Sequence, residues 1–323
     1  MDSEVIRAYT DSVRNQIFET FGVEFEAALD LEGFENFVYG VDNRVIRITH
    51  ESHRTQHQIL GELEFLRYLK ASGAAVAGPI PFDSGDEIIT MGDFHVCQFE
   101  RATGVAASME LPFTHAVIKQ WGRCIGVFHR LARDFKPIYQ RQNWHQDENH
   151  QFDARIPIDQ TVVLQRSKEL MTRLSKLEES SSSYGLIHSD AHAGNYVFDN
   201  GSLTFFDFDD CLTTWYGYDV ATILVGVALQ PWVEGTQQAM TKAVDAFLPI
   251  FMEGYSEESE SSCLLWDQMH DFLKLRELSL YGVIHAHMNP DDLDDLFPQK
   301  FMRERRARIE NEQTYVELDF SVY

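Results

Sequence analysis

The sequence predicts an α+β protein with two lobes: an N-terminal antiparallel sheet with a helix, and a larger, mainly helical C-terminal lobe. Three observations predict this fold class. Short β-rich runs separated by turns continue to about residue 100, helical periodicity dominates afterwards, and a strand–loop–hairpin pattern interrupts the helices at residues 184–206. The chain has 323 residues, of which 44% are hydrophobic, and this is long enough for two cores. We expect the lobes to span residues 1–101 and 102–323.

The elements of the first lobe follow from spacing and turn residues. Apolar residues at helical spacing predict a first helix over residues 3–21. Two β-rich runs on either side of Asp42-Asn43 predict a hairpin, and a second hairpin is expected around Gly92-Asp93. The expected strands are 37–41, 44–49, 87–91 and 94–99, with a helix over residues 52–71 between the two hairpins.

In the second lobe, a polar loop connects strands at the centre of the pattern. The apolar strand 184–187 runs into this loop, and the chain returns as strand 196–198. The turn at residues 199–201 contains Asn-Gly, a strong hairpin signal, and leads into strand 203–206. The helices expected around this motif are 116–131, 161–176, 218–229, 240–254 and 264–285.

Composition narrows the class of protein. The formal net charge of −24 argues against binding to nucleic acid or to an anionic membrane. It would suit a cationic substrate such as an amine or an amino sugar, and the alternative is an acidic surface that serves solubility alone. The start of the chain has no apolar signal region, no apolar run approaches membrane-spanning length, and the four cysteines are scattered without a CxxC pair. We therefore expect a cytoplasmic enzyme with reduced cysteines.

Three polar residues stand at the ends of the central strands. Asp190 lies in the loop after the first strand, where it can accept a proton from an attacking hydroxyl. Asn195 and Asp207 offer the oxygen ligands that Mg²⁺ prefers. The hairpin should bring all three together, which is typical of a Mg-nucleotide site. The alternative is a metallohydrolase in which His188 and His192 join Asp190 and Asp207 in a metal cluster.

The first lobe contains a cation in an apolar strand. Arg47 is flanked by apolar residues, and a buried cation requires a partner. Glu62, on the helix that follows, can supply the carboxylate, and the alternative is an exposed arginine on an edge strand. The backbone N–H groups of the turn at Glu32–Phe37 can face phosphates. The segment Glu100–Gly104, where strands give way to helices, is the expected hinge for a nucleotide base.

Together these segments resemble the aminoglycoside phosphotransferase/choline kinase family, a small-molecule branch of the protein-kinase-like fold. The resemblance rests on Arg47 with Glu62, on Glu100–Gly104, on the motif from His188 to Asp209, and on the segment Tyr218–Ala221. It implies a kinase that uses ATP and Mg²⁺, with Asp190 as the catalytic base, Asn195 and Asp207 as metal ligands, and Asp219 as a brace of the catalytic loop. The implied cofactor-binding residues are Arg47, Glu62, Phe34, Glu35, Asn36, Glu100 and Ala102.

The sequence departs from the family pattern at two positions. Arg47 stands where many relatives have lysine, and arginine is a rigid fork rather than a mobile point charge. Ser189 replaces a more usual glycine, which is tolerable unless the position requires a positive φ. Only eleven residues separate Asp207 from Asp219, too few for a peptide-binding activation segment. The expected acceptor is a small hydroxylated molecule: an amino sugar, an aminoglycoside, an amino alcohol or a homoserine-like compound. A nucleotide-binding pseudoenzyme is the competing class.

Overall fold

The computed structural model describes residues 3–106, 113–290 and 296–323. The chain divides into two compact units. The first comprises Met1–Thr103 with Phe135–Arg141, and the second comprises Gly104–Asp134 with Gln142–Tyr323. The short stretch 135–141 thus returns to the first unit, where Glu64 accepts hydrogen bonds from the backbone N–H groups of Ile138 and Tyr139.

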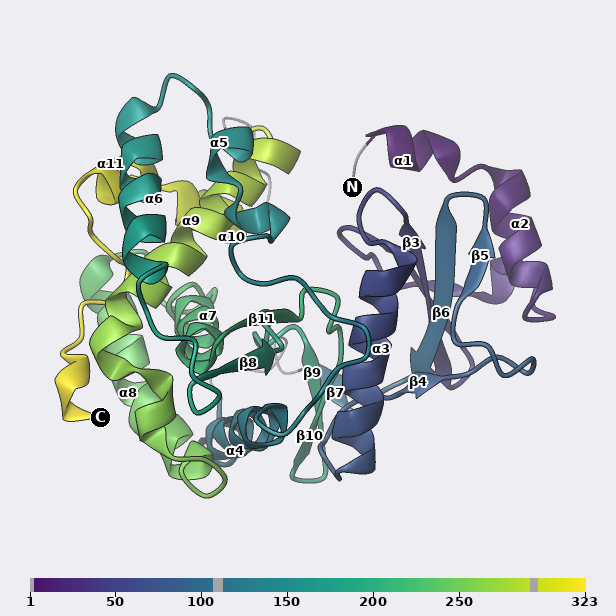
Figure 1. The fold of residues 1–323 in the computed structure, drawn as a ribbon, viewed down its shortest axis with the longest axis horizontal. Helices are drawn as coiled ribbons and strands as arrows, with labels where there is room; N and C mark the ends of the chain where they lie inside the picture. The colour runs from purple at the N-terminus through teal and green to yellow at the C-terminus, as the bar shows by residue number, and fades with distance from the viewer. Residues whose placement is uncertain (1–2, 107–112, 291–295) are drawn as a thin grey trace. The chain divides into compact units, whose positions relative to one another are not determined.

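The first unit is built on an antiparallel sheet, with helices α1 and α2 on one side and α3 on the other (Figure 1). The strand order is β1-β2-β3-β6-β4, and β5 also pairs with β6. The bounds are α1 Ser3–Ala8, α2 Asp11–Glu19, β1 Leu29–Asp30, β2 Phe37–Val41, β3 Arg44–His50, α3 Gln56–Ala71, β4 Pro79–Ile80, β5 Ile89–Met91 and β6 Phe94–Glu100.

Alternation along β3 gives the sheet two different faces. Ile46 and Ile48 are fully buried in the apolar core that also contains residues of α1 and α2. Because successive side chains of a strand point to opposite faces, Arg47 points to the other side. There it meets α3, whose Ile59, Leu63 and other apolar residues are buried.

Two predicted helices of this unit begin or end differently in the structure. The predicted helix 3–21 is two helices, because Thr10 has an extended backbone and its side chain caps the N-terminus of α2. The predicted helix 52–71 starts at Gln56, because Thr55 forms a capping box with Gln58. The predicted strand 87–91 is shorter, and only Ile89–Met91 pairs with β6.

The second unit consists mainly of helices around two small sheets, β10-β9-β7 and β11-β8. Helix α7 is almost entirely buried between its neighbours α8 and α9. The bounds are β7 Val105–Ala106, α4 His115–Ala132, α5 Phe152–Arg155, α6 Thr161–Leu174, β8 Tyr184–Ile187, β9 Tyr196–Asp199, β10 Ser202–Phe205, β11 Leu212–Trp215, α7 Tyr216–Ala228, α8 Gln237–Tyr255, α9 Met269–His287, α10 Leu296–Met302 and α11 Arg305–Glu310.

Close helix packing and one strained residue shape this unit. A Cβ atom at Gly254 of α8 would overlap the backbone of Lys119 in α4, so glycine is required there. The predicted helix 264–285 in fact starts at Met269, because Leu265 adopts a left-handed conformation with a φ of 51°. Within the part of the chain that the structure describes, no helix is both long and apolar enough to cross a membrane.

Candidate active site

The loop between β8 and β9 presents Asp190 and Asn195. The β9–β10 hairpin closes at Asn200 and Gly201, whose φ values of 48° and 91° are those of the turn expected for Asn-Gly. The N–H of Phe206 donates to the carbonyl of Asn195 at 3.0 Å, so the segment just before Asp207 lies beside the loop. The hairpin thus brings the three predicted site residues of this unit into one region, as the sequence predicted.

Asp219 holds the start of this loop from the first turn of α7. Its carboxylate accepts hydrogen bonds from the N–H of Ser189 at 2.7 Å and of His188 at 3.3 Å. The same carboxylate lies 3.2 Å from Nε2 of His129, and both side chains are fully buried. Ser189 has a φ of 69°, so this position does adopt the left-handed conformation that favours glycine. The contacts agree with the bracing role that the resemblance implies for Asp219.

Asp190 lies between two cationic groups. Nη2 of Arg276, on α9, donates to Oδ1 of Asp190 at 2.6 Å. Nε2 of His192 lies 3.3 Å from Oδ2. Burial by itself would raise the pKa of Asp190, but the charges of His192 and Arg276 outweigh burial and hold this pKa well below its usual range. In return, Asp190 raises the pKa of His192 against the opposing effect of burial. The carboxylate of Asp190 is therefore ionised at neutral pH.

The amide of Asn195 is oriented by the backbone and side chain of Asp190. Its Nδ2 donates to the carbonyl oxygen of Asp190 at 2.9 Å and to Oδ2 at 3.2 Å. Both bonds use the NH₂ end of the amide, so Oδ1 faces away from Asp190. Asp207, with a φ of 62°, presents an exposed carboxylate from the neighbouring segment. An amide oxygen and a carboxylate suit a hard cation such as Mg²⁺.

His188 is fully buried and acts on the backbone. Its Nδ1 accepts a hydrogen bond from the N–H of Asp190 at 3.4 Å, and its Nε2 lies 3.1 Å from the carbonyl oxygen of Phe206. Burial lowers the pKa of His188, so the ring is neutral. Because both ring nitrogens are engaged with backbone groups, His188 has no nitrogen left for a metal. This geometry argues against the metallohydrolase alternative.

In the first unit, Arg47 and Glu62 form a closed pair. Nη1 and Nη2 of Arg47 donate to the two carboxylate oxygens of Glu62 at 2.8 and 2.5 Å. The two side chains are only 5% and 1% exposed, so the alternative of an exposed arginine on an edge strand is wrong. A bidentate arginine–carboxylate pair has a fixed geometry. The expected partner of the cation is therefore the one found.

The predicted phosphate-facing loop is the tight connection between β1 and β2. A Cβ atom at Gly33 would overlap the carbonyl oxygen of Asn36, so the chain can turn here only with glycine. Phe34 is exposed, Asn36 is buried, and Glu35 lies 3.5 Å from Nε2 of His53. The loop has the tight backbone that the sequence indicated, and its contact with phosphates stays a prediction.

The predicted hinge begins at the end of β6. The side chain of Glu100 accepts from Nζ of Lys70 at 2.6 Å and from the N–H of Gly78 at 3.1 Å. Its own N–H donates to the carbonyl of Gly78 at 2.9 Å. Glu100 therefore fixes the end of the sheet, and Ala102 lies half-buried just beyond it. Base recognition by this segment remains a prediction.

The structure thus brings Asp190, Asn195 and the segment of Asp207 together in the second unit, and it joins Arg47 to Glu62 in the first. Sequence reasoning missed Arg276 and left the role of His192 open, although both contact Asp190. A signal for Arg276 exists in the sequence, because its neighbours on α9, including Leu273 and Leu275, are buried apolar residues. A largely buried cation requires a partner, which is the same argument that pointed to Arg47.

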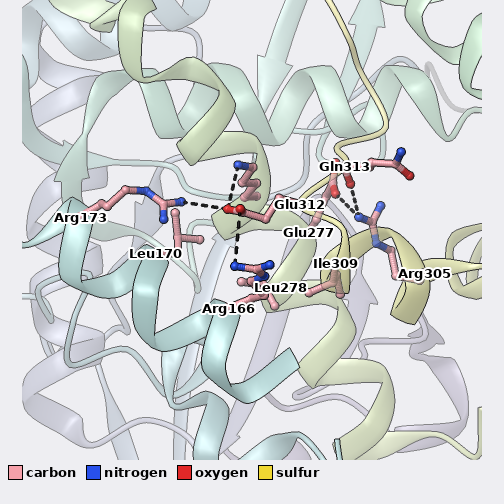
Figure 2. Close-up of a pocket in the computed structure, with 10 residues that line it drawn as sticks. Arg166, Leu170, Arg173, Glu277, Leu278, Arg305, Ile309, Glu312 and Gln313 are labelled. Atoms are coloured by element: carbon pink, nitrogen blue, oxygen red, sulfur yellow. Dashed lines mark hydrogen bonds and ion pairs between the residues drawn. The ribbon is translucent and has the colours of Figure 1, made fainter. Parts of the chain in front are cut away.

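A cavity of the second unit, shown in Figure 2, lies among α6, α9 and the C-terminal residues. Glu312 lies within 3.6–3.9 Å of three cations, Arg166, Arg173 and Lys274. Deeper, the buried Arg305 lies 2.7 Å from Glu277, the residue next to Arg276 on α9. Because these cations already have carboxylate partners, we interpret the cavity as a structural ion-pair network rather than a ligand site. The network attaches the C-terminal residues to α9.

Comparison with known proteins assigns the family. A profile of the phosphotransferase enzyme family matches residues 27–270. The chain belongs to this family. Amicoumacin kinase of Bacillus subtilis (strain 168) is 31% identical to it over 313 residues, which cover 93% of this chain and 92% of that protein. The resemblance predicted from the motifs is therefore confirmed.

Solved structures agree with this assignment. Amicoumacin kinase hAmiN, in complex with AMP-PNP, Ca²⁺ and Ami, is 29% identical, has a TM-score of 0.89 and covers 99% of both chains. A microcompartment-associated aminopropanol kinase has the same fold, with a TM-score of 0.72, 22% identity, and coverage of 94% of this chain and 97% of that one. The chain is a small-molecule kinase with the predicted bilobal, protein-kinase-like fold. The predicted use of ATP with a divalent cation agrees with the nucleotide analogue and Ca²⁺ bound to hAmiN.

Proposed function

We propose that this protein transfers the γ-phosphoryl group of ATP to a hydroxyl of a small, amine-bearing acceptor. The observation that carries the proposal is the ionised carboxylate of Asp190, placed on the same loop as Asn195 and beside the segment of Asp207. Amicoumacin kinase and aminopropanol kinase are its relatives by sequence and by fold, and the net charge of −24 suits a cationic acceptor. Because the reaction consumes ATP, we place it in the cytoplasm.

Asp190 is the proposed catalytic base. It orients the acceptor hydroxyl and takes its proton as the oxygen–phosphorus bond forms and the bond to the ADP oxygen breaks. Its low pKa makes it a weak base, which suits a loose transition state in which the proton leaves late. Arg276 and His192 keep it ionised, and the amide of Asn195 fixes its orientation.

Asn195 and Asp207 are the proposed metal ligands. When bound, Mg²⁺ would neutralise negative charge on the phosphates. Oδ1 of Asn195 is available for this because the amide NH₂ is held by Asp190. The bond between Phe206 and Asn195 keeps the exposed carboxylate of Asp207 in the same region. The chain's own contribution is therefore two oxygen ligands held by a hairpin.

The first unit is the proposed nucleotide-binding lobe, and the second carries catalysis and acceptor binding. Glu62 holds the guanidinium of Arg47 in a fixed position, from which the small exposed part of this side chain would meet the phosphates. Phe34, Glu35 and Asn36 supply the covering loop, and backbone groups of Glu100 and Ala102 meet the base. These roles come from the family resemblance, and the fixed geometry of Arg47 supports them.

The test is an ADP-release screen over amino sugars, amino alcohols and amino acids, run with the wild type and with Asp190→Asn. We expect an amine-bearing alcohol to stimulate ADP release, and Asp190→Asn to lower kcat by about 10²–10⁴-fold. Calorimetry should show that the variant still binds Mg-ATP. Asp199→Asn, the same change at an exposed position of the adjacent hairpin, serves as the control. If ATP binds but no acceptor is phosphorylated, the protein is a pseudoenzyme and the proposal fails.

A further inference from the structure

A small polar cavity lies beside the catalytic loop, within the second unit. It is small, with room for one functional group of an acceptor rather than for a drug-sized molecule. The side chains that carry its chemistry are Asp147, Asn149, Asp210, Tyr218 and Arg276. Arg276 belongs both to this cavity and to the contact with Asp190. Arg276 therefore links the cavity to the proposed catalytic base.

Two residues that line this cavity each have a buried atom without a hydrogen-bond partner within residues 3–106, 113–290 and 296–323. One is a donor, Nε of Arg276, and the other is an acceptor, Oδ1 of Asn149. Leaving a buried polar group unpaired costs about 1–3 kcal/mol, so each atom should have a partner when the site is filled. The ligand that completes both must offer an acceptor atom to Arg276 and a donor to Asn149.

The charges around the cavity specify the donor. Two carboxylates, those of Asp147 and Asp210, line the cavity together with one arginine, Arg276. The charges of Asp190 and Asp210 both raise the pKa of Arg276 against the effect of burial. His150 adds no charge, because burial lowers its pKa. The lining of the cavity therefore has more carboxylates than cations, and a positively charged group of the acceptor would balance the excess negative charge.

The cavity wall is itself held rigidly. Nδ1 of His150 lies 2.6 Å from the carbonyl oxygen of Trp144, so its Nε2 accepts from the hydroxyl of Tyr218 at 3.2 Å. The side chain of Asp147 accepts from the N–H of Asn149 at 2.8 Å and so fixes the backbone that carries this amide. The unpaired oxygen of Asn149 is therefore presented by a preorganised turn.

We propose that this cavity is the amine subsite of the acceptor, in which Oδ1 of Asn149 receives an ammonium N–H while Nε of Arg276 donates to the acceptor hydroxyl oxygen. The inference rests on the proposed kinase function and adds the acceptor's chemical class: an alcohol with a primary amine on a nearby carbon. Arg276 would hold the acceptor hydroxyl through its Nε, while its Nη2 holds Asp190. The same side chain therefore places the hydroxyl next to the catalytic base. Asn149 acts as a specificity-determining residue.

The test compares 1-amino-2-propanol with 2-butanol, in which a methyl group replaces the amino group. Both are measured with the full-length protein as acceptors by ADP release and as ligands by calorimetry in the presence of Mg-AMP-PNP. We expect the wild type to prefer the amino alcohol by at least about 100-fold in kcat/KM, because a buried acceptor left unpaired discriminates strongly. Asn149→Leu should reduce this preference by about 10–100-fold, and Asn149→Asp should preserve it. Asn15→Leu, at an exposed position of α2, is the matched control.

The outcomes separate the subsite from the kinase function. A structural defect in Asn149→Leu would lower the activity on both alcohols equally, whereas loss of the subsite lowers it selectively for the amino alcohol. If the protein neither binds nor phosphorylates 1-amino-2-propanol, or if Asn149→Leu leaves the preference unchanged, the subsite is overturned. The kinase function still stands in that case, provided that the wider screen finds an alcohol acceptor. If no alcohol is phosphorylated at all, the kinase function itself fails.

Discussion

Each unit of this kinase contains an arginine that contacts a carboxylate, buried in the first unit and partly buried in the second. The two pairs differ in how many atoms they join. In the first unit, two nitrogens of Arg47 meet both oxygens of Glu62. In the second unit, Arg276 gives one nitrogen to one oxygen of Asp190, and the other oxygen of Asp190 meets His192 and Asn195 instead. The first pair is closed and fixes a position. The second is open, as expected where a substrate completes the contacts.

The two carboxylates also differ in their surroundings. Glu62 is 1% exposed and meets one cation, whereas Asp190 is 21% exposed and meets Arg276, His192 and the amide of Asn195. A carboxylate with several donors and some access to solvent can exchange one partner for another at little cost. A sealed pair cannot, because either charge left alone is strongly destabilising. Breaking each pair should therefore have different consequences, in stability for the first and in catalysis for the second.

The largest effect on stability is expected from breaking the closed pair. Glu62→Ala removes the carboxylate that meets two nitrogens of the buried Arg47, and we expect the free energy of unfolding to fall by about 3–5 kcal/mol. Urea denaturation measures this change. Lys168→Ala, which breaks the exposed pair with Asp153, is the control and should cost less than about 1 kcal/mol. A loss as small as the control's would mean that water replaces Glu62.

A double variant sharpens the same point. Arg47→Met with Glu62→Leu removes both charges, so most of the lost stability should return. Turnover should not return, because the proposed phosphate contact of Arg47 is gone. Recovery of both stability and turnover would show that the pair serves the fold alone.

Breaking the open pair should change catalysis and its pH dependence. In Arg276→Met, the pKa of Asp190 loses a lowering influence while burial still raises it, so it moves upward. Because the ionised form is active, activity should be lost at a higher pH on the acid side, and kcat should fall by roughly 10–100-fold. The measurement is kcat/KM against pH. Arg130→Met, at an exposed pair on α4, is the control. An unshifted acid limb would show that Arg276 does not set the ionisation of Asp190.

The contrast between the pairs also explains what the sequence could predict. The Asn-Gly turn and the strands around it are local, so Asp190, Asn195 and Asp207 were placed correctly relative to one another. Glu62 lies fifteen residues from Arg47, on the helix that follows its strand. Arg276 lies eighty-six residues from Asp190, on a helix whose placement depends on tertiary packing. No local sequence pattern predicts a contact between residues so far apart in the chain.

The starts of helices and the strained backbone of Ser189 were predicted less well, because they also depend on contacts that local patterns do not show. Helix starts depended on which threonine provided the cap, and Thr10 and Thr55 were not recognised as capping residues. The amine subsite was missed because Asn149 and Arg276 meet only in the folded protein. Ser189 was noted as a departure, but only the structure gives its positive φ. Sequence thus predicted residue types and local geometry, and tertiary packing supplied their partners.

The smallest expected effect concerns this strained backbone beside the open pair, which has no counterpart in the regular strand of Arg47. A left-handed conformation costs a non-glycine residue about 1–2 kcal/mol, and Asp219 holds Ser189 in it through the backbone N–H. Ser189→Gly removes that strain but makes the unfolded chain more flexible, which costs about 0.5–1 kcal/mol. We therefore expect a net stabilisation of about 0.5 kcal/mol, measured by urea denaturation. Ser189→Val should instead destabilise, because a β-branched residue resists a positive φ. If Ser189→Gly destabilises the protein as much as Ser189→Val does, contacts of the serine side chain contribute more to stability than the backbone strain costs. Strain at residue 189 would then not distinguish the Asp190 site from the Arg47 site.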